Sequence, residues 1–105
     1  MKIVNEIIME QSATMDMIYQ LKQQVAEQEM KKSEIEYQLW ANTDFSKLGL
    51  SNSDQRKAFV KDQLKQITNE ISNIKNDLLY AENQFKLLKT KEKFLLEFGL
   101  DVFDE

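Results

Sequence analysis

The residue types that most often carry out chemistry are scarce in this chain. Its 105 residues include no histidine and no cysteine, which excludes imidazole acid/base catalysis, thiolate nucleophiles and zinc sites built from these side chains. Paired carboxylates remain, such as Glu34 with Glu36 and Asp101 with Asp104, but neither pair lies in a motif that predicts a pocket. We therefore expect no catalytic residue, no metal and no cofactor, and we predict that the protein is not an enzyme.

The composition is typical of long helices. Charged residues make up 30% of the chain and hydrophobic residues 42%, proline is absent, and glycine occurs only at Gly49 and Gly99, so little interrupts a helix. The formal net charge of −4 disfavours a protein that coats nucleic acid. The N-terminal residues lack the uninterrupted apolar segment and the small-residue cleavage site expected of a signal peptide, and no window is apolar enough to cross a membrane. We expect one domain, residues 1–105, in the cytoplasm and without membrane contact.

Residues 60–95 carry the strongest pattern. Apolar side chains recur there at alternating steps of four and three, interrupted only at Glu92, which predicts a helix with an a/d seam about 50 Å long. Such a seam has to be covered by another helix. Its apolar residues are Val60, Leu64, Ile67, Ile71, Ile74, Leu78, Ala81, Phe85, Leu88 and Leu95.

Residues 3–42 are predicted to form the covering helix. One a/d frame runs through this segment, and four of its positions are polar. We interpret these polar layers as features that set register and pairing at some expense in stability. The frame consists of Val4, Ile7, Gln11, Thr14, Ile18, Leu21, Val25, Gln28, Lys32, Ile35 and Leu39.

Residues 43–53 form the one predicted break. Thr43 can cap a short helical turn, and Gly49 can end that turn in the left-handed conformation. Ser51 or Ser53 can then serve as the N-cap of the next helix. We expect four large apolar side chains to form a plug that closes the turn: Trp40, Phe45, Leu48 and Leu50.

Because this connection is short, we expect the helices at 3–42 and 53–98 to form an antiparallel hairpin, with an acidic tail at 99–105. Apolar side chains outside the seam are concentrated in the first half of one helix and the last half of the other. A lone hairpin buries only one stripe from each helix. We therefore predict an all-α helical hairpin that self-associates, as a homodimer or a larger oligomer, into a four-helix bundle. The predicted oligomer interface consists of Ile8, Met15, Tyr80, Leu87, Phe94 and Phe98.

A modest basic patch lies near the predicted hairpin tip. Between residues 31 and 65 there are seven basic and five acidic side chains. An ordinary solvated face is the simplest interpretation, and contact with nucleic-acid phosphate or with an acidic partner is the alternative. The residues that would make this contact are Lys47, Arg56, Lys57, Lys61 and Lys65.

The acidic tail carries Val102 and Phe103 between its carboxylates. Two interpretations are open. The tail is either a frayed terminus or a short docking peptide that places Phe103 in a pocket of a partner.

The turn resembles a segment of small uncharacterised coiled-coil proteins of phages and prophages of Gram-positive bacteria. The similarity covers about fifteen residues, from Asp44 to Ala58, together with the layout of two long heptad helices. Such proteins are encoded among early genes, near recombination and replication functions. The resemblance implies an accessory protein of DNA recombination, replication or host takeover, with a phage or host protein as its partner.

A second resemblance is to the WXG100 secreted helical hairpins, which have about this length and carry Trp-x-Gly in the turn. Here the turn reads Trp40-Ala41-Asn42, without the glycine. The expected export signal, Tyr-x-x-x-Asp/Glu, is missing as well, because Tyr80 is followed four residues later by Gln84. This resemblance ranks below the first.

The sequence thus favours a non-enzymatic, oligomeric interaction protein that acts as a phage scaffold or adaptor, with itself and a phage or host protein as partners. Three alternatives stay open. They are a nucleic-acid-binding accessory that uses the basic tip, an acidic inhibitor of a host enzyme that mimics nucleic acid, and a WXG100-like secreted hairpin.

Overall fold

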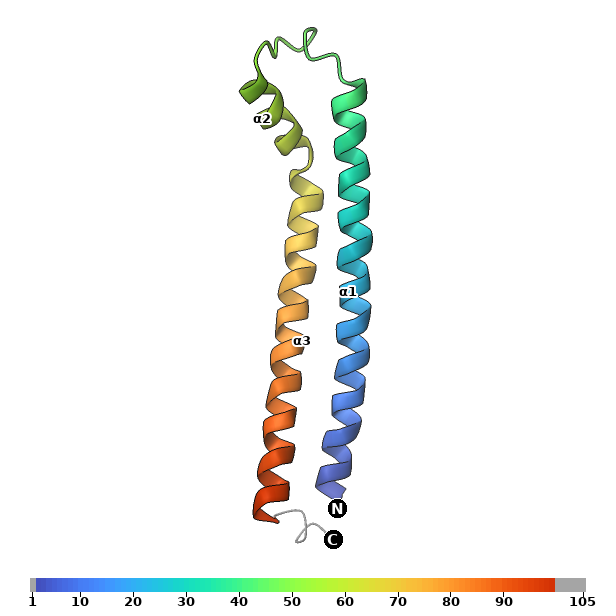
Figure 1. The fold of residues 1–105 in the computed structure, drawn as a ribbon, viewed down its shortest axis with the longest axis vertical. Coiled ribbons are helices and arrows are strands. Elements are labelled where there is room, and N and C mark those ends of the chain that lie inside the picture. Colours follow the sequence, from blue (N-terminus) through green and yellow to red (C-terminus); the bar gives the residue numbers. More distant parts are fainter. Residues whose placement is uncertain (1, 100–105) are drawn as a thin grey trace. The chain divides into compact units, whose positions relative to one another are not determined.

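The computed structural model describes residues 2–99, and these residues are helical apart from the turn at 43–52, Leu64 and Gly99. Helix α1 spans Lys2–Asn42, α2 spans Ser53–Gln63 and α3 spans Lys65–Phe98 (Figure 1). No strand occurs among the described residues. The predicted all-α class is therefore confirmed.

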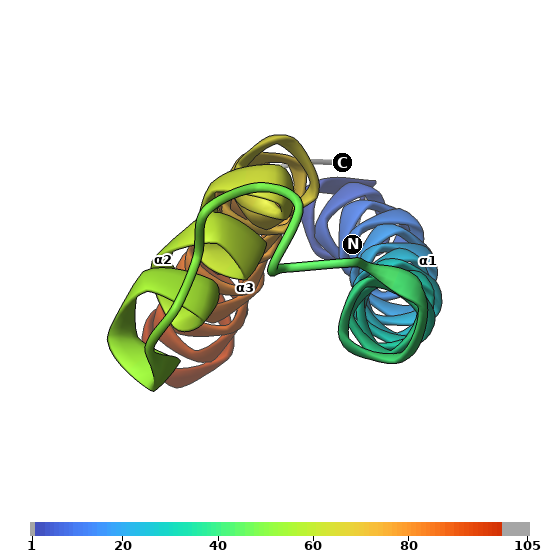
Figure 2. The ribbon, with the colours of Figure 1, turned by 90° about the horizontal axis from the view of Figure 1, so that it is seen from above.

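The chain folds as two compact units. Of the described residues, unit 1 contains 2–23 and 75–99, and unit 2 contains 24–74. In unit 1 the first part of α1 lies beside the last part of α3, running in the opposite direction (Figure 1). In unit 2 the rest of α1 lies beside α2 and the start of α3, and the turn joins the two sides (Figure 2).

The heptad frame expected from the sequence is the packing frame of both units. Every frame position from Val60 to Leu95 is buried or half-buried, including Glu92. On α1 every frame position is also buried or half-buried, except Ile35, which is 37% exposed. Because full burial of a large apolar side chain contributes about 1.5–3 kcal/mol, these a/d contacts are the main source of stability in each unit.

One element differs from the prediction of a single helix over 53–98. The helix is divided at Leu64, whose backbone has φ −91° and ψ 0°. The Leu64 amide donates to the Val60 carbonyl at 3.1 Å, and the Leu64 carbonyl accepts from the amide four residues later at 2.9 Å. Hydrogen bonding therefore continues on both sides of the break, while α2 leans away from α1 (Figure 1). The seam itself is not interrupted, because Val60 and Leu64 belong to one core with Ile67 and Ile71.

An aromatic wedge accounts for this bend. Phe45 is 9% exposed, and its ring centroid lies 5.5 Å from that of Trp40 on α1 and 6.2 Å from that of Phe59 on α2. Helices that pack directly lie about 8–10 Å apart, so a ring between them holds α2 away from the end of α1. The expected apolar plug forms around Phe45 and Leu50, whereas Leu48 is 53% exposed and lies outside it.

The left-handed Gly49 is confirmed, with φ +74°. The Leu50 amide donates to the Phe45 carbonyl at 3.0 Å, and the Gly49 amide donates to the Ser46 carbonyl at 3.1 Å. These two bonds define a Schellman motif, which is completed by the apolar contact between its flanking residues. The contact is present, since Leu50 packs against the core that contains Phe45.

The start of this turn differs from the prediction. The Thr43 amide donates to the Leu39 carbonyl at 3.2 Å, so Thr43 still belongs to the hydrogen-bonded end of α1. The side chain of Asp44 accepts from the Lys47 amide at 3.3 Å. Asp44 thus takes the capping role that we predicted for Thr43.

Asn52 is the N-cap of α2, so the prediction of Ser51 or Ser53 was wrong. The Asn52 side chain accepts from the Gln55 amide at 2.8 Å, and the Gln55 side chain accepts from the Ser51 amide at 2.9 Å. This exchange resembles a capping box in which the returning bond is displaced by one residue. Asn and Ser are about equally good N-caps, so residue type alone could not distinguish between them.

Candidate interaction surfaces

Exposed apolar side chains are concentrated in unit 1. Of the seventeen large apolar residues that are exposed in the described chain, twelve belong to unit 1 and five to unit 2. Single exposed apolar residues are normal on protein surfaces. A concentration of them in one unit indicates an interaction site.

The a/d frame sorts these residues onto two sides of unit 1. In an antiparallel pair the g and c positions of both helices flank the seam on one side, and the e and b positions flank it on the other. On the g/c side, Tyr80, Leu87 and Phe94 repeat at a spacing of seven and are 67%, 47% and 55% exposed. We call this side the ridge face. Its apolar residues are Ile3, Ala13, Met17, Tyr80, Leu87, Phe94 and Phe98.

Two hollows lie along the ridge face between α1 and α3. One has a volume of about 310 Å³ and is lined by Met17 of α1 together with Tyr80 of α3. The other has a volume of about 360 Å³ and is lined by Ile3 together with Phe94. Lys91 borders both hollows. The ridge face therefore carries a largely apolar groove beside its row of large side chains.

The e/b side of unit 1 is also apolar, but it is rich in lysine. Ile8 and Met15 lie there on α1 and are 48% and 47% exposed, and Leu79 and Leu96 lie there on α3, both 58% exposed. We call this side the lysine face. Its charged residues are Lys22, Lys75, Glu82, Lys86, Lys89 and Lys93.

The six residues predicted as one oligomer interface are thus divided between two faces. The four from α3 lie on the ridge face, whereas Ile8 and Met15 lie on the lysine face. All six are exposed in the single chain. The sequence showed the surplus of apolar residues, and assigning each residue to a heptad position would also have shown the division.

The two faces differ in charge. The lysine face carries five lysines and one glutamate, whereas the ridge face carries Glu6, Glu10, Asp77 and Lys91. The lysine face is therefore basic and the ridge face acidic, in a chain with a formal net charge of −4. The sequence analysis placed the basic surface only near the turn and missed this second one.

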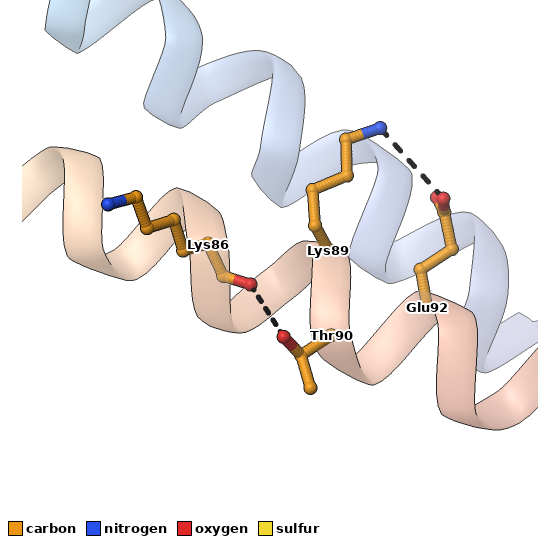
Figure 3. Close-up of polar contacts among 4 residues, drawn as sticks. All are labelled: Lys86, Lys89, Thr90 and Glu92. Atoms are coloured by element: carbon orange, nitrogen blue, oxygen red, sulfur yellow. Dashed lines mark hydrogen bonds and ion pairs between the residues drawn. The ribbon is translucent and has the colours of Figure 1, made fainter.

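Only weak contacts along α3 hold Lys89 on the lysine face. The Lys89 ammonium lies 5.7 Å from the centroid of the Phe85 ring and 3.9 Å from Oε1 of Glu92. Figure 3 shows this ion pair, and it shows the Thr90 hydroxyl, which donates to the Lys86 carbonyl at 3.0 Å. Exposed ion pairs contribute only about 0–1 kcal/mol. The Lys89 side chain can therefore turn toward a partner at small cost.

Arg56, which we predicted as a contact for phosphate or a partner, helps to hold the turn of unit 2. Its Nε donates to the Leu50 carbonyl at 3.0 Å, and its guanidinium carbon lies 5.4 Å from the centroid of the Phe45 ring. A guanidinium stacked on an aromatic ring is partly desolvated and stabilising. These two contacts give Arg56 a structural role in stabilising the turn.

The lysines predicted for the same contact are also in unit 2. Lys57 and Lys61 border a hollow of about 260 Å³ together with Lys32. Lys61 also borders a second hollow, of about 390 Å³, with Lys65. Lys47 lies in the turn. The structure thus gathers three lysines around one hollow of unit 2.

Two of the polar seam positions, Gln11 and Gln28, each have one polar atom without a hydrogen-bond partner among the described residues. Gln11 is 7% exposed, and its Nε2 has no hydrogen-bond partner among the described residues; the same holds for Oε1 of Gln28. Thr14 is satisfied, because its hydroxyl donates to the Glu10 carbonyl at 2.7 Å. A buried unpaired polar group costs about 1–3 kcal/mol. The buried, unpaired amide of Gln11 is therefore an example of a polar seam position that lowers the stability of the fold.

The chain matches no protein-family model, no curated protein and no solved structure. None of the described helices is long and apolar enough to cross a membrane. Within residues 2–99, no three side chains of the metal-ligating types lie close enough to hold an ion together. Val102 and Phe103, the predicted docking residues of the tail, lie outside the described residues.

Proposed function

We propose that this protein is a non-enzymatic interaction protein that self-associates through unit 1. The observation that supports this proposal is the exposure of Tyr80, Phe94 and Phe98, at 67%, 55% and 61%. An aromatic side chain presents about 150–250 Å², so these three alone leave on the order of 350 Å² of side chain in water.

The remaining exposed apolar residues of unit 1 extend this area. A typical monomer has a largest apolar patch of about 300–600 Å², and a standard interface buries about 800 Å² on each partner. Unit 1 exposes twelve large apolar residues, most of them divided between its ridge face and its lysine face, so each face adds apolar surface for such an interface. In the proposed assembly, unit 1 of one copy lies against unit 1 of another, so that four helices share one apolar core.

We propose further that the assembly acts in the cytoplasm as a scaffold or adaptor for phage DNA recombination, replication or host takeover. The resemblance of the turn, residues 44–58, and of the two-helix layout to phage coiled-coil proteins supports this context. The partner would be a phage or host protein. Affinity capture from infected cells tests the context: enrichment of DNA-processing proteins supports it, and a set without them contradicts it.

Light scattering after size-exclusion chromatography tests self-association. We expect a mass of at least two chains at micromolar concentration. A monodisperse, stable monomer across the micromolar range would refute the proposal, because the exposed area of unit 1 would then need no cover.

Nucleic-acid binding is a second candidate, favoured by one observation in unit 2. Lys32, Lys57 and Lys61 border the same hollow, and clustered lysines can neutralise phosphates. Gel shifts at low and moderate salt test it, with Lys57→Ala as the variant and Lys31→Ala, outside that hollow, as the control. Binding that weakens steeply as salt rises, and that is weakened by Lys57→Ala but not by Lys31→Ala, supports this function. The absence of a shift at low salt rejects it.

A further inference from the structure

We propose that self-association is heterologous: the lysine face of one copy binds the ridge face of the next copy. This inference rests on the proposed self-association and specifies which surfaces meet. It is drawn from two features of unit 1, the opposite charge of its two apolar faces and their matching repeat.

Charge disfavours pairing of either face with itself. Two lysine faces in contact would bring together five lysines and one glutamate from each copy, and the neighbouring Glu92 and Glu97 offset only Lys89 and Lys93. Two ridge faces would bring together Glu6, Glu10 and Asp77 of each copy, with only Lys91 to offset them. Like charges brought together at an interface weaken binding, whereas complementary potentials favour it and fix its register. A lysine face against a ridge face is the pairing in which the charges are complementary.

The apolar side chains of the two faces also have a common repeat. Tyr80, Leu87 and Phe94 are spaced by seven residues on the ridge face, and Ile8 and Met15 are spaced by seven on the lysine face. Seven residues of helix span about 10.5 Å, so the two rows can interdigitate along their length. The lysine stems can lie over the ridge face while their ammonium groups remain at its rim.

A heterologous contact leaves one unused face at each end of the assembly. A dimer made in this way still presents one lysine face and one ridge face, and addition of copies continues unless the rotation closes a ring. We therefore expect oligomers larger than two chains, whose size grows with concentration until a ring closes. A closed dimer would instead use the same face of both copies.

Two double variants separate these possibilities. Leu87→Gln with Phe94→Gln removes apolar surface from the ridge face, and Ile8→Gln with Met15→Gln removes it from the lysine face. All four side chains are about half exposed, at 47%, 55%, 48% and 47%, so the folded chain should tolerate both changes. Glutamine adds no charge, so the two variants cannot restore binding to each other through a new ion pair.

Each double variant alone should bind its own kind at least about 30-fold more weakly, which is the change in Kd that corresponds to two interface anchors at about 1 kcal/mol each. Mixed at equal amounts, the two variants should form a 1:1 complex that does not grow. In that complex the intact lysine face of one variant holds the intact ridge face of the other. Met9→Gln, at a 72% exposed residue on neither face, should behave as the unmodified protein. Circular dichroism confirms that all variants remain helical.

Three results would overturn the inference. In the first, one double variant keeps the oligomer size of the unmodified protein. In the second, the two variants fail to form the 1:1 complex. In the third, the unmodified protein stops at two chains, and substitutions on only one of the two faces weaken its self-association. Each of these leaves self-association in place. A monomeric unmodified protein, by contrast, would refute the proposed function as well.

Discussion

Replacement of Gly49 by alanine isolates the cost of one backbone conformation. Gly49 has φ +74° at the end of the Schellman motif, and a Cβ added there would meet no atom within 4 Å. The substitution therefore introduces no clash with neighbouring residues. What remains is the left-handed conformation itself, which costs a non-glycine residue about 1–2 kcal/mol.

The surroundings of Gly49 prevent the turn from relaxing to avoid this cost. The next residue, Leu50, donates its amide to the Phe45 carbonyl at 3.0 Å and packs in the core of unit 2. Rotation of residue 49 out of the left-handed region would break this bond and unpack that core. We therefore expect Gly49→Ala to lower the free energy of unfolding by about 1–2 kcal/mol. For a domain of this size, each kcal/mol corresponds to a fall in Tm of about 4–8 °C.

Urea unfolding followed by circular dichroism, at one fixed protein concentration, measures this change. Gly99→Ala is the matched control, because Gly99 has φ +62° and an added Cβ there also meets nothing within 4 Å. Gly99 directly follows α3, whose last turn can fray locally, so its loss should be below about 0.5 kcal/mol. Gly49→Asn should cost less than Gly49→Ala, since Asn tolerates the left-handed region. Equal losses for the two glycines, or no loss at residue 49, would refute the reasoning.

The remaining predictions concern side chains and use the same unfolding assay. Gln11→Leu should raise the free energy of unfolding by about 1–3 kcal/mol, because it removes a buried unpaired donor. The control Gln23→Leu, at an exposed residue, should change it by less than about 0.5 kcal/mol. Destabilisation by Gln11→Leu would show that its amide is satisfied. Asn52→Ala should cost about 1 kcal/mol through loss of the N-cap, and an unchanged midpoint would contradict that role. Arg56→Ala should cost about 1–2 kcal/mol through the bond to the turn and the stacking on an aromatic ring, whereas exposed Lys57→Ala should be nearly neutral; equal effects of these two variants would contradict the structural role of Arg56.

Much of the fold followed from spacing alone. The seam from Val60 to Leu95 and the frame from Val4 to Leu39 were read from steps of three and four, and all but Ile35 of their positions are covered in the structure. This succeeded because an apolar stripe on a long helix has to meet another helix. The single turn was predictable for a similar local reason, since Gly49 is the residue that can take its left-handed conformation.

Details of the turn required the folded chain. The choice of Asn52 over its neighbours as N-cap depends on backbone geometry that several residue types would accept. We attribute the break at Leu64 to Phe45, a residue distant in sequence, which shares a core with Leu64 and whose ring contacts both Trp40 and Phe59. Local propensity contains no information about such a wedge.

By itself, then, the sequence determined the helices, the seam that joins them and the surplus of apolar side chains, because these depend on periodicity along one chain. Heptad positions already divide these residues between two sides of the seam, and only the tertiary structure decided which residues of the two helices line a common hollow. Placing α1 against α3 brings Met17 beside Tyr80 and Ile3 beside Phe94 along one groove. In the same packing, Ile8 and Met15 take e positions on the opposite, lysine-rich side. The physical reason is that each hollow is lined by two helices at once, so its shape exists only after the helices have paired.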